Sequence, residues 1–139
     1  MSQRVLVPFD ESDPASEAFE EALREYPEGE IVLLHAIDPG TSGHGLEGAA
    51  AGDLSGQRRE EVEELLADAE RRAEQHGVEI TTAIERGPPG STIVEYAEEN
   101  DVDRIVMGSH DRSGISKILL GSVAEDVVKE SPVTVTVVR

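Results

Sequence analysis

Five short apolar runs, separated by longer segments with helical periodicity, constrain the fold of this chain more than any other feature. Runs of this length, rich in valine, isoleucine and leucine and bounded by charge, glycine or proline, are typical of buried strands. Strands that alternate with helices predict a parallel sheet, because each parallel pair needs a helical crossover. We therefore expect a doubly wound α/β fold with a five-stranded parallel sheet and helices on both faces. The predicted strands cover 4–9, 31–37, 78–84, 103–107 and 133–138.

The segments between these runs carry start and stop signals for helices. Asp13 is a candidate N-cap for a helix that ends near residue 26. A second helix ends before Gly77, which we interpret as its C′ residue because glycine adopts the left-handed conformation that this position requires. This second helix covers 57–76, and the other two predicted helices cover 88–97 and 116–129.

Length and composition indicate one domain with one core. The chain has 139 residues, of which 37% are hydrophobic, and no cysteine, which excludes a disulfide framework and thiolate metal sites. No signal-peptide pattern begins the sequence, and no apolar run approaches the roughly 18 residues that span a bilayer. We expect a single domain over 1–139, located in the cytoplasm and without a membrane partner.

The segment 38–56 is the longest stretch without periodicity. It contains six glycines, which predicts a flexible loop. We favour a mobile flap near a functional crevice, with plain disorder as the alternative.

The charge balance excludes one further class of partner. The chain has 30 Asp and Glu residues against 12 Lys and Arg, a formal net charge of −18, which repels nucleic acid. The acidic residues are spread over the chain while the predicted strands stay apolar. We interpret this surface as that of a protein from a halophile, whose solvent shortens the Debye length to about 3 Å. An ordinary acidic protein from a mesophile is the alternative.

The fourth apolar run leads directly into a glycine turn. Gly108 and Ser109 follow this strand, and a second Gly-Ser pair, Gly121 and Ser122, comes thirteen residues later. A strand, a glycine turn and a helix N-terminus together bring backbone N–H groups to a phosphate. The structural alternative is that Gly108 ends a strand and Gly121 relieves crowding between helices.

This spacing resembles the nucleotide signature of the universal stress protein family, which is Gly, two residues, Gly, nine residues, then Gly-Ser or Gly-Thr. Gly108 and Gly121-Ser122 fit its first and last positions, whereas the middle glycine is replaced by Asp111. The segments 5–10, 34–38 and 131–138 are similar to the first, second and last strands of the family, so the resemblance covers nearly the whole chain.

The resemblance implies a strand order of 3-2-1-4-5 and an ATP site in the crevice between strands 1 and 4. Pro8 and Asp10 would lie beside the ribose and base, and the backbone of Ala36 would bind adenine. The other residues implied at the site, mostly around the phosphates, are Met107, Gly108, Ser109, His110, Asp111, Gly121, Ser122 and Val123. Capping of the turn before the first helix is the structural alternative for Asp10.

Asp111 leaves two interpretations open. Its carboxylate either repels the phosphates, because a like charge at about 4 Å costs on the order of 4 kcal/mol at an intermediate dielectric, or it shares Mg²⁺ with the triphosphate, since this ion takes carboxylate and phosphate oxygens together.

Specific catalysis has little support in the sequence. The chain lacks a cysteine nucleophile, a Gly-x-Ser-x-Gly turn, a Walker lysine loop and a metal-spaced histidine pair. Slow ATP hydrolysis in a nucleotide-gated switch is the most that we expect. The alternative function is a nucleotide-free dimeric module that acts through contacts with partners.

The last run predicts an assembly surface. Its alternation places Val133, Val135 and Val137 on one face of the strand, and Thr134, Thr136 and Val138 on the other. In the order 3-2-1-4-5 the strand 133–138 lies at an edge of the sheet, where it carries unpaired backbone groups and no interior charge. A two-fold pairing of this strand with its copy satisfies those groups in a closed homodimer.

Overall fold

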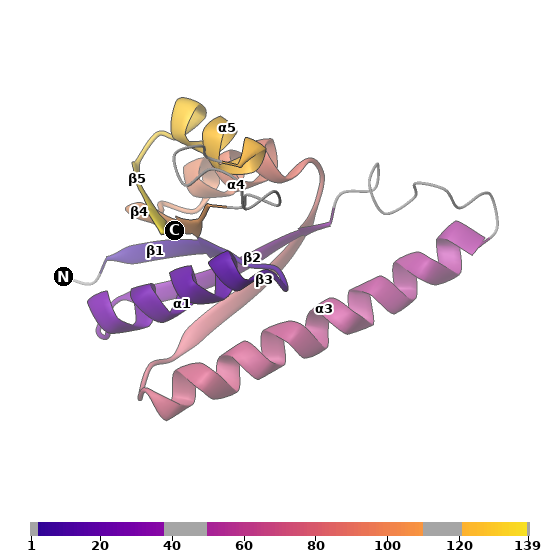
Figure 1. Cartoon of the computed structure of the whole chain (residues 1–139), viewed down its shortest axis with the longest axis horizontal. Coiled ribbons are helices and arrows are strands. Elements are labelled where there is room, and N and C mark those ends of the chain that lie inside the picture. Colours follow the sequence, from indigo (N-terminus) through magenta and orange to yellow (C-terminus); the bar gives the residue numbers. More distant parts are fainter. Residues whose placement is uncertain (1–2, 38–49, 110–120, 139) are drawn as a thin grey trace.

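The computed structural model describes residues 3–37, 50–109 and 121–138, with the side chains of 50–57 left out of the description. Its five parallel strands form one sheet in the order β3-β2-β1-β4-β5, which confirms the expected topology (Figure 1). The strands are β1 (Arg4–Pro8), β2 (Glu30–Ile37), β3 (Ile80–Arg86), β4 (Arg104–Gly108) and β5 (Thr134–Val138). The helices are α1 (Asp13–Glu25), α3 (Ala50–Gln75), α4 (Pro89–Glu99) and α5 (Ser122–Glu130).

Several boundaries differ from the sequence prediction. Strand β3 covers Ile80–Arg86 rather than 78–84, and α4 covers Pro89–Glu99 rather than 88–97. Residues 50–56 belong to α3 rather than to the glycine-rich loop that the sequence predicts, and residues 38–49 lie outside the described part of the chain. The N-cap of α1 is Ser12 rather than Asp13, because the Ser12 hydroxyl accepts the N–H of Ala15 at 3.3 Å. Both aspartate and serine suit a cap, so composition alone could not decide between neighbouring positions.

The carboxyl end of α3 matches the prediction in detail. Gly77 has a φ of +73°, the left-handed conformation expected of a C′ residue. Its N–H donates to Glu74 O, and the N–H of Val78 donates to Ala73 O, both at 2.9 Å. These two bonds form a Schellman motif, which turns the chain sharply from α3 into β3.

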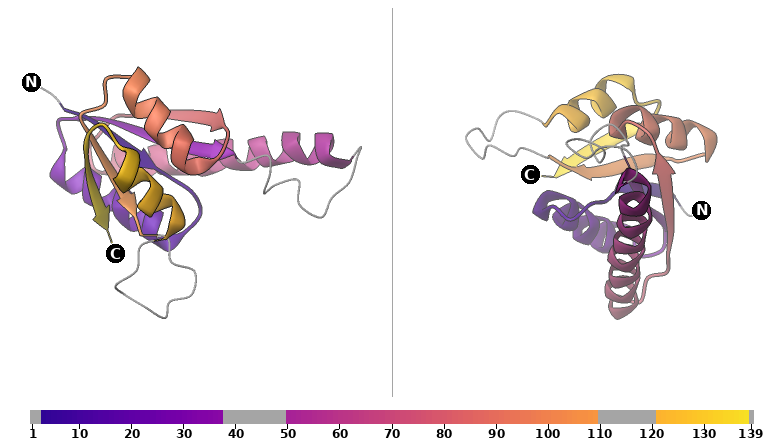
Figure 2. Two further views of the ribbon diagram at one scale, coloured as in Figure 1. Left: turned by 90° about the horizontal axis from the view of Figure 1, so that it is seen from above. Right: turned by 90° about the vertical axis from the view of Figure 1, so that its right-hand side faces the viewer.

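Two apolar layers hold the helices against the sheet. Helices α1 and α3 lie on one side, and α4 and α5 lie on the other (Figures 1 and 2). The alternation of β5 matches the sequence: Val135 and Val137 pack on the α4 and α5 side, whereas Val138 packs on the α1 and α3 side. The largest side chains that are essentially fully buried are Leu6, Phe19, Ile31, Leu33, Leu34 and Ile105.

Phe19 joins α1 to both β1 and α3. Its ring meets that of Phe9 edge-on, with centroids 5.5 Å apart. The guanidinium of Arg72 lies 5.3 Å from the centroid of the Phe19 ring and also bonds Ser16 and Glu20 on α1. Arg72 therefore links α3 to α1 through a cation–π contact with Phe19 and through polar bonds with Ser16 and Glu20.

Helix α3 is longer than the sheet that it covers. Its 26 residues span about 39 Å, and its amino end extends past the strands in Figure 1. Helix α3 is long enough to cross a membrane but is highly charged. In the described residues no helix has the apolar stretch that a membrane span requires.

Candidate functional site

The chain reverses its winding direction between β1 and β4. Val5 pairs with Ile31 on β2 and with Arg104 on β4, so β1 is central and the strands on its two sides are followed by helices on opposite faces. In such sheets ligands bind outside the carboxyl ends of the strands at this switch point. Pro8 ends β1 and Gly108 ends β4 at that edge, so the sheet brings these two predicted site residues together.

Asp10 follows β1 at the switch point of the sheet and is half-buried. Its Oδ1 accepts the backbone N–H of Ser12 at 2.8 Å and the Ser12 hydroxyl at 2.5 Å. An aspartate that binds the N–H two residues on forms an Asx turn, which fixes the carboxylate in one orientation. Capping of the turn and a role at the site are therefore compatible, because these bonds engage one carboxylate oxygen.

Ser12 is a residue that the sequence interpretation missed. Its hydroxyl donates to Asp10 and accepts from Ala15 at the first turn of α1, so it ties the carboxylate to the helix. The Asp-x-Ser spacing is the signal that could have found it, since this spacing is typical of Asx turns that lead into helices.

Ala36 lies on β2 beyond the end of β1. The N–H of Phe9 donates to Leu34 O at 2.8 Å, the last such bond between β1 and β2 in the described residues. Peptide groups in a strand alternate between its two sides, so those of Ala36 face the same side as those of Leu34. The N–H and C=O of Ala36 therefore point over the end of β1, toward the switch point.

His35, the buried histidine beside the end of β1, has a structural role. His35 is 4% exposed, and its Nδ1 lies 2.9 Å from Phe9 O, so the ring links β2 to the chain that follows β1.

Gly108 has a packing role. A Cβ on this residue would lie 2.4 Å from both the carbonyl carbon and the oxygen of Pro14, and 2.7 Å from its Cβ. Only glycine lets the end of β4 approach the first turn of α1 this closely. The absence of a side chain at Gly108 therefore lets the carboxyl end of β4 pack against the start of α1, the helix that follows β1.

The neighbours of Gly108 are held by the sheet. Met107 is 4% exposed and packs in the core beside α4 and α5. The N–H of Ser109 donates to Val138 O at 2.8 Å, which extends the ladder between β4 and β5. Because this N–H is bonded to Val138, only the Ser109 hydroxyl remains to donate a hydrogen bond to a phosphate.

The amino end of α5 supplies the second Gly-Ser pair. Gly121 is the N-cap of α5, with φ −66° and ψ 162°, and has no side chain to accept the N–H groups of the first turn. Ser122 is exposed and Val123 half-buried. A helix N-terminus of this kind carries partial positive charge and donors suited to an anion.

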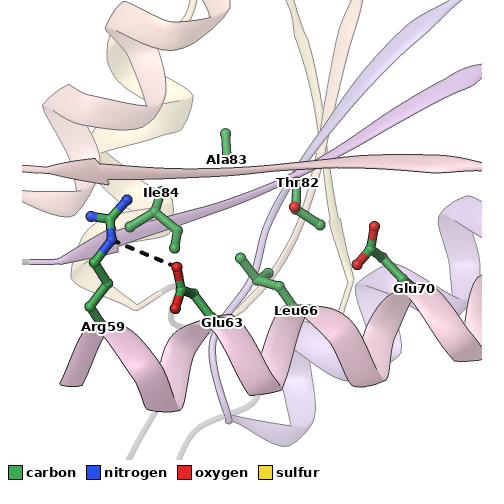
Figure 3. Close-up of a pocket in the computed structure, with 7 residues that line it drawn as sticks. All are labelled: Arg59, Glu63, Leu66, Glu70, Thr82, Ala83 and Ile84. Carbon is green, nitrogen blue, oxygen red and sulfur yellow. Dashed lines mark ion pairs between the residues drawn. The ribbon is translucent and has the colours of Figure 1, made fainter. Parts of the chain in front are cut away.

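Two predicted site residues, His110 and Asp111, lie outside the described residues. Among those that are described, no three histidine or acidic side chains gather closely enough to hold a metal ion. A groove of about 350 Å³ lies away from the switch point, between α3 and β3 (Figure 3).

Comparisons with known proteins agree with this geometry. The model of the universal stress protein family matches residues 1–139. Universal stress protein MJ0531 of Methanocaldococcus jannaschii is 35% identical, with 99% of this chain and 82% of the relative covered.

Solved structures extend the similarity to the whole fold. The structure of MJ0577, from the same organism, superposes with a TM-score of 0.84 at 33% identity, over 99% of this chain and 96% of that one. A universal stress protein solved in complex with cAMP superposes with a TM-score of 0.72 at 26% identity, over 99% and 97%.

Proposed function

Because this chain belongs to the universal stress protein family, we propose that it binds ATP in the crevice between β1 and β4 and acts as a nucleotide-dependent regulatory protein. The observation that carries the proposal is the meeting of Pro8, Gly108 and the Asp10 turn at the switch point of the sheet. The relative that is solved with cAMP supports an adenine nucleotide as the ligand.

The described residues fit the parts of an adenine nucleotide. The N–H and C=O of Ala36, which point over the end of β1, offer one donor and one acceptor, and this pair suits an adenine edge. Asp10 offers a fixed carboxylate for ribose hydroxyls. The N–H groups at the start of α5, around Ser122 and Val123, suit the phosphates.

Calorimetry tests this proposal directly. ATP with Mg²⁺ should release or absorb heat on binding in molar KCl, where screening reduces the effect of the −18 net charge. The same titration without Mg²⁺ measures whether the metal contributes to affinity. Absence of heat with both ATP and ADP, on a chain shown to be folded, would contradict the proposal.

The Asp111→Gly variant separates the two roles of this carboxylate. Binding of ATP should tighten if the carboxylate repels phosphate, and should weaken if it holds Mg²⁺.

The second candidate function, a nucleotide-free module that acts through partner contacts, is favoured by Asp111 itself, because this residue replaces a glycine of the signature.

We also propose that two copies pair through β5. This strand is a sheet edge with half-buried valines and a threonine, and Val128 on the neighbouring α5 is exposed at 47%. An isologous antiparallel contact would pair the outer backbone groups of both strands.

Light scattering in molar KCl should report a dimer, and Val135→Lys should shift it to monomer, because two added charges would face each other near the two-fold axis. Gln75→Lys, which adds the same single charge at the exposed carboxyl end of α3, is the matched control and should leave the dimer intact. A wild-type monomer at high protein and salt concentration would refute this interface.

A further inference from the structure

The second edge of the sheet, β3, has an open side. Gly87 N–H donates to Ile37 O at 2.9 Å. Because peptide groups alternate in direction along a strand, those of Ile84 and Thr82 point away from β2. In the described part of the chain no strand pairs with this outer side, since β3 is terminal in the sheet.

The middle of β3 lacks the usual protections of an edge. Residues 80–84 read Ile-Thr-Thr-Ala-Ile, without charge, proline or glycine, and are mostly half-buried. Natural edges usually carry a charge, a proline or a bulge that prevents strand addition. An unprotected edge of this length can accept one more strand.

A groove runs beneath the same edge. Its walls are α3 and β3, and its volume is about 350 Å³. Figure 3 shows Glu63, Leu66 and Glu70 of α3 directed toward β3, with Ile84 above Glu63 and Thr82 above Leu66 and Glu70. Leu66 is 3% exposed and supplies an apolar floor between the two carboxylates.

The charges in the groove select the occupant. Glu63 and Glu70 are both exposed, and the only cation among the lining residues, Arg59, lies 3.9 Å from Glu63. Because this ion pair is long and solvated, Arg59 neutralises little of the negative charge in the groove. A second copy of this chain would bring the same carboxylates and a net charge of −18, whereas a basic segment would be attracted.

The spacing of the groove residues defines the segment further. Glu63 and Glu70 are seven residues apart on the helix, about 10.5 Å. In an added strand, side chains on the groove face recur every second residue, so positions i and i+4 lie about 13 Å apart. Flexible lysine or arginine side chains at those positions can reach both carboxylates, and position i+2 then lies over Leu66.

We propose that the outer edge of β3 and the groove beneath it bind an extended basic segment of a partner protein, which adds to the sheet as a sixth strand. The preferred pattern is basic, any, apolar, any, basic. This site is independent of the nucleotide crevice and lies at the opposite edge of the sheet from β5.

The test uses the full chain and a labelled nine-residue peptide with the central pattern Lys-Thr-Val-Thr-Lys. Fluorescence anisotropy should detect binding at the lowest KCl concentration at which circular dichroism shows a folded chain. Amide hydrogen exchange should slow at least tenfold at Thr82 and Ile84, whose N–H groups face outward, with much smaller changes at Thr81 and Ala83.

Charge reversal provides the specificity test. The double variant Glu63→Lys/Glu70→Lys should weaken binding of the basic peptide about tenfold and should bind a Glu-Thr-Val-Thr-Glu peptide instead. Glu64→Lys/Glu74→Lys, which makes the same double charge reversal at two exposed positions of α3 outside the groove, should stay within twofold of wild type.

Thr82→Pro tests strand addition separately from charge. Its missing N–H is an outward one, so the ladder with β2 should survive while peptide binding is lost. The proposal is overturned if Thr82 and Ile84 show no protection, if both peptides bind wild type equally, or if two copies of the chain prove to pair through β3.

Discussion

Replacing Gly108 with alanine should lower the free energy of unfolding by about 3 kcal/mol or more, because overpacking that moves the backbone is costly. The new Cβ would lie 2.4 Å from two backbone atoms of Pro14, and these cannot rotate away as a side chain can. We expect the melting temperature to fall by roughly 10 °C, as measured by circular dichroism at fixed KCl concentration.

Two controls isolate this contact. Gly77→Ala meets no atom within 4 Å but places alanine at a φ of +73°, so it should cost only about 1 kcal/mol from conformation alone. Pro14→Ala should not rescue Gly108→Ala, since the clash is with the carbonyl group at 14 rather than with the ring alone. Equal destabilisation by the two glycine variants would contradict the packing role of Gly108.

Replacing Ser122 with aspartate should remove nucleotide binding, with a loss of about a hundredfold or more, because a carboxylate would stand beside the phosphates. Ser122 is exposed and begins α5, where a negative charge stabilises the helix N-terminus. The variant should therefore fold at least as well as wild type. Titration calorimetry with ATP measures the affinity, and thermal melting verifies the fold.

Gly121→Val and Ser91→Asp complete this experiment. The backbone of Gly121 has angles open to any residue, so a valine there should block the phosphates by bulk rather than by charge. Ser91→Asp adds the same charge to the first turn of α4 and should leave ATP affinity within a few fold. Unchanged affinity in both Ser122→Asp and Gly121→Val would remove α5 from the proposed site.

Part of the candidate site was predictable from the sequence. The sequence indicates Gly108 because it begins a glycine turn after an apolar strand, whereas the role of Asp10 is implied by the family resemblance. The sheet does bring the ends of the two strands that precede them together. The contact between Gly108 and Pro14 was not predictable, because it joins positions 94 residues apart whose approach depends on how α1 lies across β4. The use of the Ser109 N–H by Val138 depends likewise on the register of β5.

The sequence by itself determined the succession of elements. Apolar runs set the strands, Gly77 ended α3, and the alternation in 133–138 assigned each valine to its face, because burial and backbone conformation act on neighbouring residues. The strand order came from family resemblance rather than from these patterns.

Only the tertiary structure decided which residues from distant parts of the chain lie in contact. It chose Ser12 over Asp13 as the cap, stacked Arg72 on Phe19, and left a groove between α3 and β3. Each of these outcomes depends on distances between elements that are far apart in the chain. Such distances follow from the packing of whole helices on the sheet, and no local pattern of residues encodes them.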